Sequence, residues 1–216
     1  MGEKLSKFVE KWEAKDTPGL ATRIKETIKP PGPLKPRLDA AMRALQLQIQ
    51  KLEIANQKFQ ERDRAIFSKI VDAYSRHDMD HAKIYANELA EIRKMSKLLM
   101  QSKMALEQIV MRLSTVTELG DIVATLAPAM GVIRSVKSGI STLLPEAEKE
   151  LGDISTILSS ILVDAGQTAG LSINFETANE DAMKILSEAA AIAEQKVKEK
   201  LPELPTGVGL GEKTGF

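Results

Sequence analysis

The chain has 216 residues, no cysteine, only 4% aromatic residues, and 30 acidic and 30 basic residues. The missing cysteines exclude disulfides and thiolate metal sites, and the few aromatic residues favour packed helices over a β-sheet. The zero net charge hides a reversal, because residues 1–112 carry 22 basic and 15 acidic residues whereas residues 113–216 carry 8 and 15. The two halves can therefore pair with each other or with a second copy.

Residues 1–16 predict an amphipathic membrane-binding helix. Its expected inserting face and the lysines beside it are Leu5, Phe8, Val9 and Trp12 with Lys4, Lys7 and Lys11. An apolar face with Trp and Phe, flanked by lysines, is typical of an interfacial anchor. The alternative is docking on the chain's own core or on a neighbouring copy. The charges do not fit a signal peptide, and no apolar run is long enough to cross a bilayer, so we expect a soluble, cytoplasmic chain.

Residues 17–35 form a linker rich in proline and glycine, which no helix survives. Residues 36–162 predict an all-α core that begins with a long antiparallel hairpin at about 36–119. Its first apolar register is Leu38, Met42, Leu45, Ile49, Leu52, Phe59, Ile66 and Ile70, interrupted by Asn56 and Asp63. Its second is Tyr85, Leu89, Ile92, Leu99, Leu106, Val110 and Leu113, interrupted by Ser96 and Lys103. Asp78 or Asp80 can cap the second helix, although one continuous helix is the alternative.

The remaining sequence predicts shorter, acidic helices. Gly120 is expected to end the hairpin, and residues 121–162 to form one helix to about 140, with Pro128 as a possible kink site, and another from Pro145. Residues 163–176 are a predicted linker that contains a loop from Gly166 to Asn174. Residues 177–200 predict a last helix that starts with the capping box of Thr177 and Glu180. Residues 201–216 are expected to be an unstructured tail.

The sequence offers little for an enzyme. It has no glycine-rich phosphate loop and no nucleophile elbow, so we expect no catalytic residue and no cofactor. The only histidines, His77 and His81, are four residues apart and could hold a metal, but a solvated, capped turn is favoured. We therefore predict no metal site.

A basic stripe runs along the first long helix, distinct from its apolar register. Its members are Arg37, Lys51, Lys58, Arg62, Lys69 and Arg76. One interpretation is a solubilising face balanced by nearby acids. The other is a surface for anionic lipid, to which each Lys or Arg contributes about 1 kcal/mol. Nucleic acid fits less well, because few aromatic residues are present to stack on bases.

The segment Leu201-Pro202-Glu203-Leu204-Pro205 follows the last helix. Alternating Leu and Pro are typical of an extended docking peptide that lies in a helical groove. Simple helix termination by Pro202 is the alternative, although it does not require the second Leu-Pro pair.

In this order of segments the chain resembles the ESCRT-III proteins, and specifically the archaeal CdvB cell-division group, over residues 1–205. The resemblance implies a filament subunit that remodels membranes at the inner face of the cell membrane, in cell division first and in vesicle release as a second process. It implies paralogous ESCRT-III partners and a AAA ATPase with an MIT domain, recruited by Leu201, Pro202, Leu204 and Pro205. Some CdvB-type members carry a winged helix after this motif, whereas this sequence ends 11 residues after Pro205, as expected for a short paralogue.

A second hypothesis is a helical scaffold or adaptor whose heptad hairpin dimerises as a coiled coil. For the leading hypothesis we expect the acidic half to cover the basic hairpin in the monomer. The sequence leaves open whether that pairing occurs within one subunit or between neighbours.

Overall fold

The computed structural model describes residues 33–116, 119–170 and 174–201. Within these residues it contains five helices and no strand, which confirms the predicted all-α class. They are α3 (Leu34–Ser75), α4 (Met79–Ser114), α5 (Leu119–Ile140), α6 (Pro145–Ala169) and α7 (Phe175–Lys200). The predicted N-terminal anchor lies outside the described residues.

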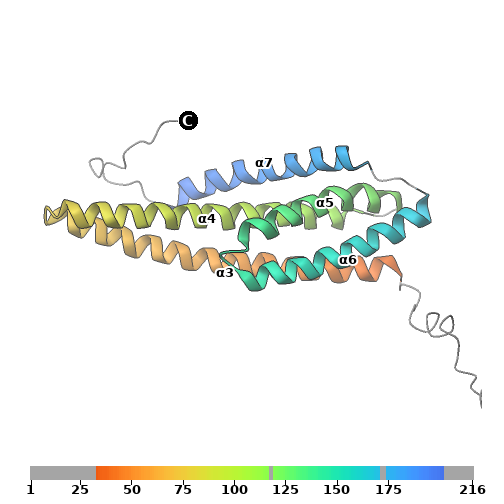
Figure 1. The fold of residues 1–216 in the computed structure, drawn as a ribbon, viewed down its shortest axis with the longest axis horizontal. Coiled ribbons are helices and arrows are strands. Elements are labelled where there is room, and N and C mark those ends of the chain that lie inside the picture. Colours follow the sequence, from red (N-terminus) through yellow and green to blue (C-terminus); the bar gives the residue numbers. More distant parts are fainter. Residues whose placement is uncertain (1–32, 117–118, 171–173, 202–216) are drawn as a thin grey trace, which may run out of the picture. The chain divides into compact units, whose positions relative to one another are not determined.

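The helices α3 and α4 form the predicted antiparallel hairpin (Figure 1). The 42 residues of α3 span about 63 Å at 1.5 Å per residue. The chain reverses at His77, which has a left-handed φ of 59°. Asp78 then caps α4, because its carboxylate accepts the backbone N–H of His81 at 3.2 Å. The capped reversal separates the two helices, so this structure shows the hairpin and not one continuous helix.

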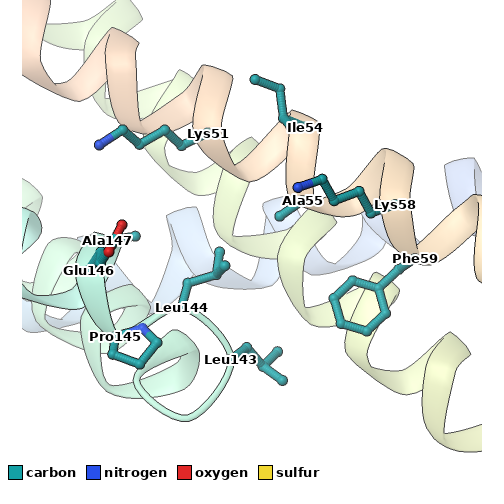
Figure 2. A pocket seen from close by; sticks show the side chains of 10 residues that line it. All are labelled: Lys51, Ile54, Ala55, Lys58, Phe59, Leu143, Leu144, Pro145, Glu146 and Ala147. Carbon is teal, nitrogen blue, oxygen red and sulfur yellow. The ribbon is translucent and has the colours of Figure 1, made fainter.

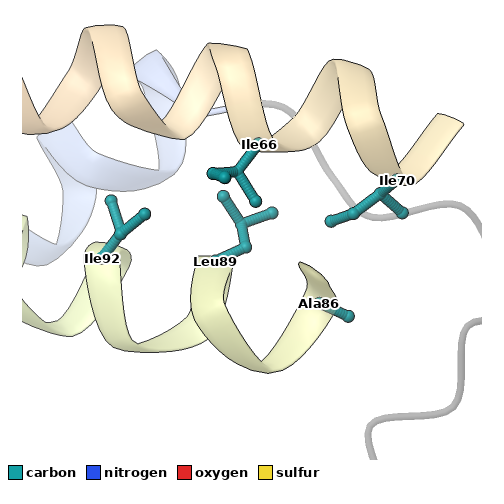
Figure 3. Packing of buried hydrophobic residues seen from close by; sticks show 5 residues of the cluster. All are labelled: Ile66, Ile70, Ala86, Leu89 and Ile92. Atoms are coloured by element: carbon teal, nitrogen blue, oxygen red, sulfur yellow. The ribbon is translucent and has the colours of Figure 1, made fainter. Parts of the chain in front are cut away.

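Apolar side chains of both helices fill the hairpin near its tip. Ile66 and Ile70 of α3 pack against Ala86, Leu89 and Ile92 of α4, and all five are at most 5% exposed (Figure 3). The polar interruptions of the two registers also meet inside the hairpin. Ser96 donates a 2.7 Å hydrogen bond to the side-chain oxygen of Asn56, and Arg93 binds the buried carboxylate of Asp63 at 2.7 Å. Buried polar groups with partners of this kind fix the register of one helix against the other.

The three later helices pack along the hairpin. The helix α5 contacts α4, α6 and α7, and α7 also contacts α4. In Figure 1, α6 runs along α3, α7 runs along α4, and the hairpin tip extends beyond all three. In the described part of the chain, no helix has an apolar stretch long enough to span a membrane.

The end of the hairpin differs from the prediction. Gly120 does not end the second helix: α4 stops at Ser114, and Gly120 belongs to α5. The hydroxyls of Ser114 and Thr115 bond back to the carbonyls of Met111 and Arg112, and so satisfy carbonyls that a longer helix would use.

The bounds of α6 and α7 also correct the prediction. Gly166 lies inside α6, which continues to Ala169 and ends at Gly170, whose left-handed φ of 63° suits glycine. The predicted capping box of Thr177 and Glu180 is wrong. Asn174 caps α7 instead, because its side chain accepts the N–H groups of Glu176 and Thr177, and Asn is as good an N-cap as any residue type.

Candidate functional site

Acidic residues of α6 bind the two stripe cations furthest from the hairpin tip, Arg37 and Lys51. Arg37 donates to Asp164 at 2.5 Å and to the hydroxyl of Ser160 at 2.6 Å. Lys51 contacts both carboxylate oxygens of Glu150, at 2.6 and 2.7 Å. The two cations lie 14 residues apart on α3, and the two carboxylates lie 14 residues apart on α6. Both ion pairs therefore fit a single antiparallel register of α6 against α3. Two of the six stripe cations thus lie under α6.

Glu150 is the most connected of these acids. It also accepts a hydrogen bond from the side-chain amide of Gln48, which is 2% exposed on α3. The hydrogen bonds from Lys51 and then Gln48 lower the pKa of Glu150 below its ordinary value. Its carboxylate is therefore charged at neutral pH and binds two neighbouring turns of α3.

Of the other four stripe cations, three contact residues of the hairpin, and Lys58 has no ion pair in the described part of the chain. Arg62 binds Glu88 of α4 at 2.7 Å, and Arg76 binds Asp72 of its own helix at 3.0 Å. The ammonium of Lys69 lies 5.6 Å from the ring centre of Tyr85. Lys58 makes no ion pair with another described residue. The stripe is therefore divided between Arg37 and Lys51, which α6 binds, and four cations closer to the hairpin tip that form no ion pair with the described residues of α6.

The helix α7 covers the other side of the hairpin. Its Glu194 binds Lys97 of α4 at 3.2 Å and Lys198 of α7 at 3.1 Å. These contacts, from Lys198 first and Lys97 second, lower the pKa of Glu194. We call Glu150, Asp164 and Glu194 the acidic cover, because each of these three carboxylates binds a cation of the hairpin.

A pocket of about 690 Å³ lies between α3 and the turn that joins α5 to α6. Figure 2 shows Phe59 of α3 and the turn residues Leu143 and Leu144 at its wall. Its remaining lining is Lys51, Ile54, Ala55, Lys58, Pro145, Glu146 and Ala147. The wall is mostly apolar, with lysines on the α3 side.

The predicted turn histidines have local partners. The ring nitrogen Nδ1 of His81 lies 2.7 Å from a carboxylate oxygen of its cap, Asp78. Among residues 33–116, 119–170 and 174–201, no group of three or more His, Cys, Asp or Glu is placed to hold a metal ion.

The chain is similar to two curated cell division proteins. It is 43% identical over 173 residues to Cell division protein B1 of Sulfolobus acidocaldarius, an alignment that covers 80% of this chain and 81% of that protein. It is 34% identical over 161 residues to Cell division protein B of the same organism, over 74% of this chain and 62% of that protein. The chain belongs to the CdvB-type ESCRT-III family. No family model and no solved structure matches this CdvB-type chain.

The structure of the CdvB-type chain describes only part of the predicted sites. The anchor residues Leu5, Phe8, Val9 and Trp12, and Lys4, Lys7 and Lys11, lie outside the described residues. So do Pro202, Leu204 and Pro205. Leu201 is described: it is half-buried and caps α7 by donating its N–H to the carbonyl of Val197 at 3.0 Å.

The sequence analysis does not predict the role of two cations of this CdvB-type chain. Lys97 and Lys103 of α4 bind Glu194 and Glu53, the second pair at 2.6 Å, yet the predicted basic surface was confined to the first helix. Lys103 was noted only as a polar interruption of an apolar register. A lysine at a seam position, 19% exposed here, signals a partner across the seam.

Proposed function

We propose that this chain is a filament-forming subunit that remodels the membrane in archaeal cell division, and that the same mechanics serve vesicle release. The observation that carries the proposal is the 43% identity to Cell division protein B1 over 80% of the chain. The chain would act as a peripheral protein at the inner face of the cell membrane, at the division site, together with ESCRT-III-like paralogues and without enzymatic activity.

The acidic cover supports a closed monomer that opens on an anionic membrane. Arg37 and Lys51 each bind a carboxylate of α6 in this structure. Partly exposed pairs of this kind contribute at most about 1 kcal/mol each. An anionic membrane attracts each Lys or Arg by about the same amount. Lipid head groups can therefore replace Asp164 and Glu150 as partners of Arg37 and Lys51 at little cost in free energy. A filament neighbour that binds the opened hairpin would shift the equilibrium further toward the open form.

The N-terminal segment is assigned to membrane insertion through Leu5, Phe8, Val9 and Trp12. Sedimentation with anionic liposomes tests this assignment in the full chain. The double variant Phe8→Glu/Trp12→Glu should lose most of its binding, because two charges enter the inserting face. The matched control, Thr17→Glu/Thr22→Glu, adds the same charge to the linker and should bind like the parent. Equal binding by the first variant and the parent would remove the anchor from the proposal.

The segment from Leu201 to Pro205 is assigned to an MIT-domain ATPase that disassembles the filament. A peptide spanning residues 195–210 should bind an MIT domain, and Leu201→Asp/Leu204→Asp in that peptide should abolish binding, because the apolar side chains fill the groove. No binding below millimolar concentration by the parent peptide would contradict this assignment.

The rival function is a coiled-coil scaffold or adaptor. In this structure the apolar registers of α3 and α4 pack on each other, and Leu45, Leu52, Leu89 and Leu99 are fully buried. A dimer built on that seam would first have to open the hairpin. The fold therefore favours the membrane-remodelling subunit over an adaptor that dimerises through the seam.

A further inference from the structure

The pocket between α3 and the α5–α6 turn has an apolar wall and a lysine without an ion pair among the described residues. Seven of its ten lining residues are apolar, and Ile54 at its edge is 54% exposed. Lys58 also lines the pocket and makes no ion pair with another described residue. An occupant that complements this site has apolar side chains and a negative charge beside them.

The last helix ends near the same stretch of α3. Lys196 of α7 contacts the sulfur of Met104 at 3.7 Å, and the neighbouring Lys103 binds Glu53 of α3 at 2.6 Å. The pKa of Glu53 is lowered, first by the hydrogen bond from Lys103 and in smaller part by the charge of Lys200. The last turn of α7 thus lies at the same stretch of the hairpin as Glu53, which is next to the pocket residue Ile54.

The distance from there to the pocket is short. Glu53 and Ile54 are consecutive on α3 and so lie about 100° apart around a helix of diameter 10–12 Å, an arc of about 10 Å. The exposed side chains of Gln50 and Gln57 show that this arc faces solvent. An extended Pro-rich chain advances about 3.1 Å per residue. The four residues from Lys200 to Leu204 span about 12 Å when extended, which is comparable to this arc.

We propose that the segment Leu201–Pro205 docks in cis in this pocket, with Leu204 and Pro205 against its apolar wall and Glu203 beside Lys58. Two Leu and two Pro side chains supply the apolar surface, and Glu203 is the only charge in the segment. Pro-rich segments lose little conformational entropy when they bind, because they are already extended. The turn that closes the pocket leads into α6, so the docked segment would also hold α6 against α3.

This inference concerns the segment that the proposed function gives to an ATPase, but it does not rest on that function. If the pocket holds the segment, an MIT domain must displace it before it can bind. Docking in the pocket and binding to an MIT domain are measured separately, so either can fail alone.

Methyl NMR of the full chain tests the docking. Leu204→Asp should shift the methyl signals of Ile54, Leu143 and Leu144 and leave those of the buried Leu126 unchanged. The matched control, Leu210→Asp, places the same charge further along the tail and should shift none of them. Unchanged signals of all three pocket residues in the Leu204→Asp variant would overturn the proposal.

A charge exchange tests the partner of Lys58. Lys58→Glu should release the segment, by about two- to fivefold as expected for an exposed pair, and Lys58→Glu/Glu203→Lys should restore the parent signals. Dilution separates docking in cis from docking on a second copy: the difference between parent and Leu204→Asp should not change with protein concentration. A difference that grows with concentration, or pocket signals that respond to anionic vesicles but not to Leu204→Asp, would assign the pocket to a second copy or to lipid and overturn docking in cis.

Discussion

Glu150 of α6 binds Lys51 of α3 through both carboxylate oxygens, at 2.6 and 2.7 Å. The two residues are 99 positions apart, one in the basic half of the chain and the other in the acidic half. The basic and acidic halves of the sequence therefore pair with each other within one chain at this contact. Asp164 and Arg37 repeat it four helical turns away.

Loss of the Glu150 carboxylate should loosen α6. Glu150→Gln removes the charge that binds Lys51 and weakens the contact with Gln48, so the amides of α6 should exchange hydrogen up to about fivefold faster, as expected for a pair worth at most about 1 kcal/mol. The matched control is Asp153→Asn, which removes one charge from the exposed side of the same helix. Hydrogen exchange with mass spectrometry measures both, and equal protection of α6 in the two variants would count against the role of Glu150.

The buried Asp63 should contribute strongly to the hairpin. Its side chain is 1% exposed and binds Arg93, which is 22% exposed. Asp63→Ala leaves a half-buried guanidinium without that carboxylate, so the free energy of unfolding should fall by about 2–4 kcal/mol. Glu88→Ala, which breaks the exposed pair with Arg62, should cost less than about 1 kcal/mol. Urea unfolding measures the free energy of unfolding of both variants. Similar decreases in the two would show that burial does not determine how much each ion pair contributes.

Close packing of α5 on α7 makes Gly131 sensitive to size. A Cβ atom at Gly131 would lie 3.0 Å from the Cβ of Ala182, a contact too tight to keep. Gly131→Val should therefore lower the free energy of unfolding by about 1–3 kcal/mol. Gly152 is the control, because its nearest neighbour is the flexible end of Lys137 at 3.3 Å. Gly152→Ala should raise stability by about 0.5–1 kcal/mol through helix propensity, and thermal unfolding that reverses this order would contradict the packing.

Acid should open the structure. The folded-state pKa of Glu150 is lowered by Lys51 and Gln48, and that of Glu194 by Lys198 and Lys97. Their contribution is fully present above the ordinary carboxyl pKa of about 4.3 and is lost as the pH falls below it, through the lowered folded values.

The chain has no cysteine, so Gln46→Cys/Ser159→Cys places two spin labels on exposed sites of α3 and α6 without background. The distribution of distances between the two labels should stay narrow from pH 7 to about pH 5 and should broaden below about pH 4. Broadening already at pH 6 would point to histidine instead of these carboxylates.

The apolar pattern predicted the hairpin because it depends on local spacing. Leu38, Leu45, Leu52, Ile66 and Ile70 are all buried as their register requires. The turn was also predictable, since an Asp cap is a local signal and Asp78 occupies that position. The register also includes Ile49, which is only half-buried, whereas the neighbouring Gln48 is buried. Gln48 faces Glu150 of α6, a contact with another helix that a hairpin register does not contain.

The ends of the shorter helices and the pairing of the stripe were not predictable in the same way. Gly166 looked like the start of a loop, but a glycine inside a helix costs only about 1 kcal/mol and tertiary packing overrides it. Neighbouring Ala165, fully buried, shows that packing. Which acid meets Lys51 depends on how α6 lies along α3, and the sequence contains no local signal for that register.

Electron microscopy on anionic liposomes tests the central claim most directly. The claim is that the acidic cover restrains a chain able to form membrane-bound filaments. Glu150→Gln/Asp164→Asn should form filaments on the liposomes at lower protein concentration than the parent, and the control Asp153→Asn should behave like the parent. Discrete oligomers with no filament for any of the three proteins would contradict the account and favour the coiled-coil adaptor.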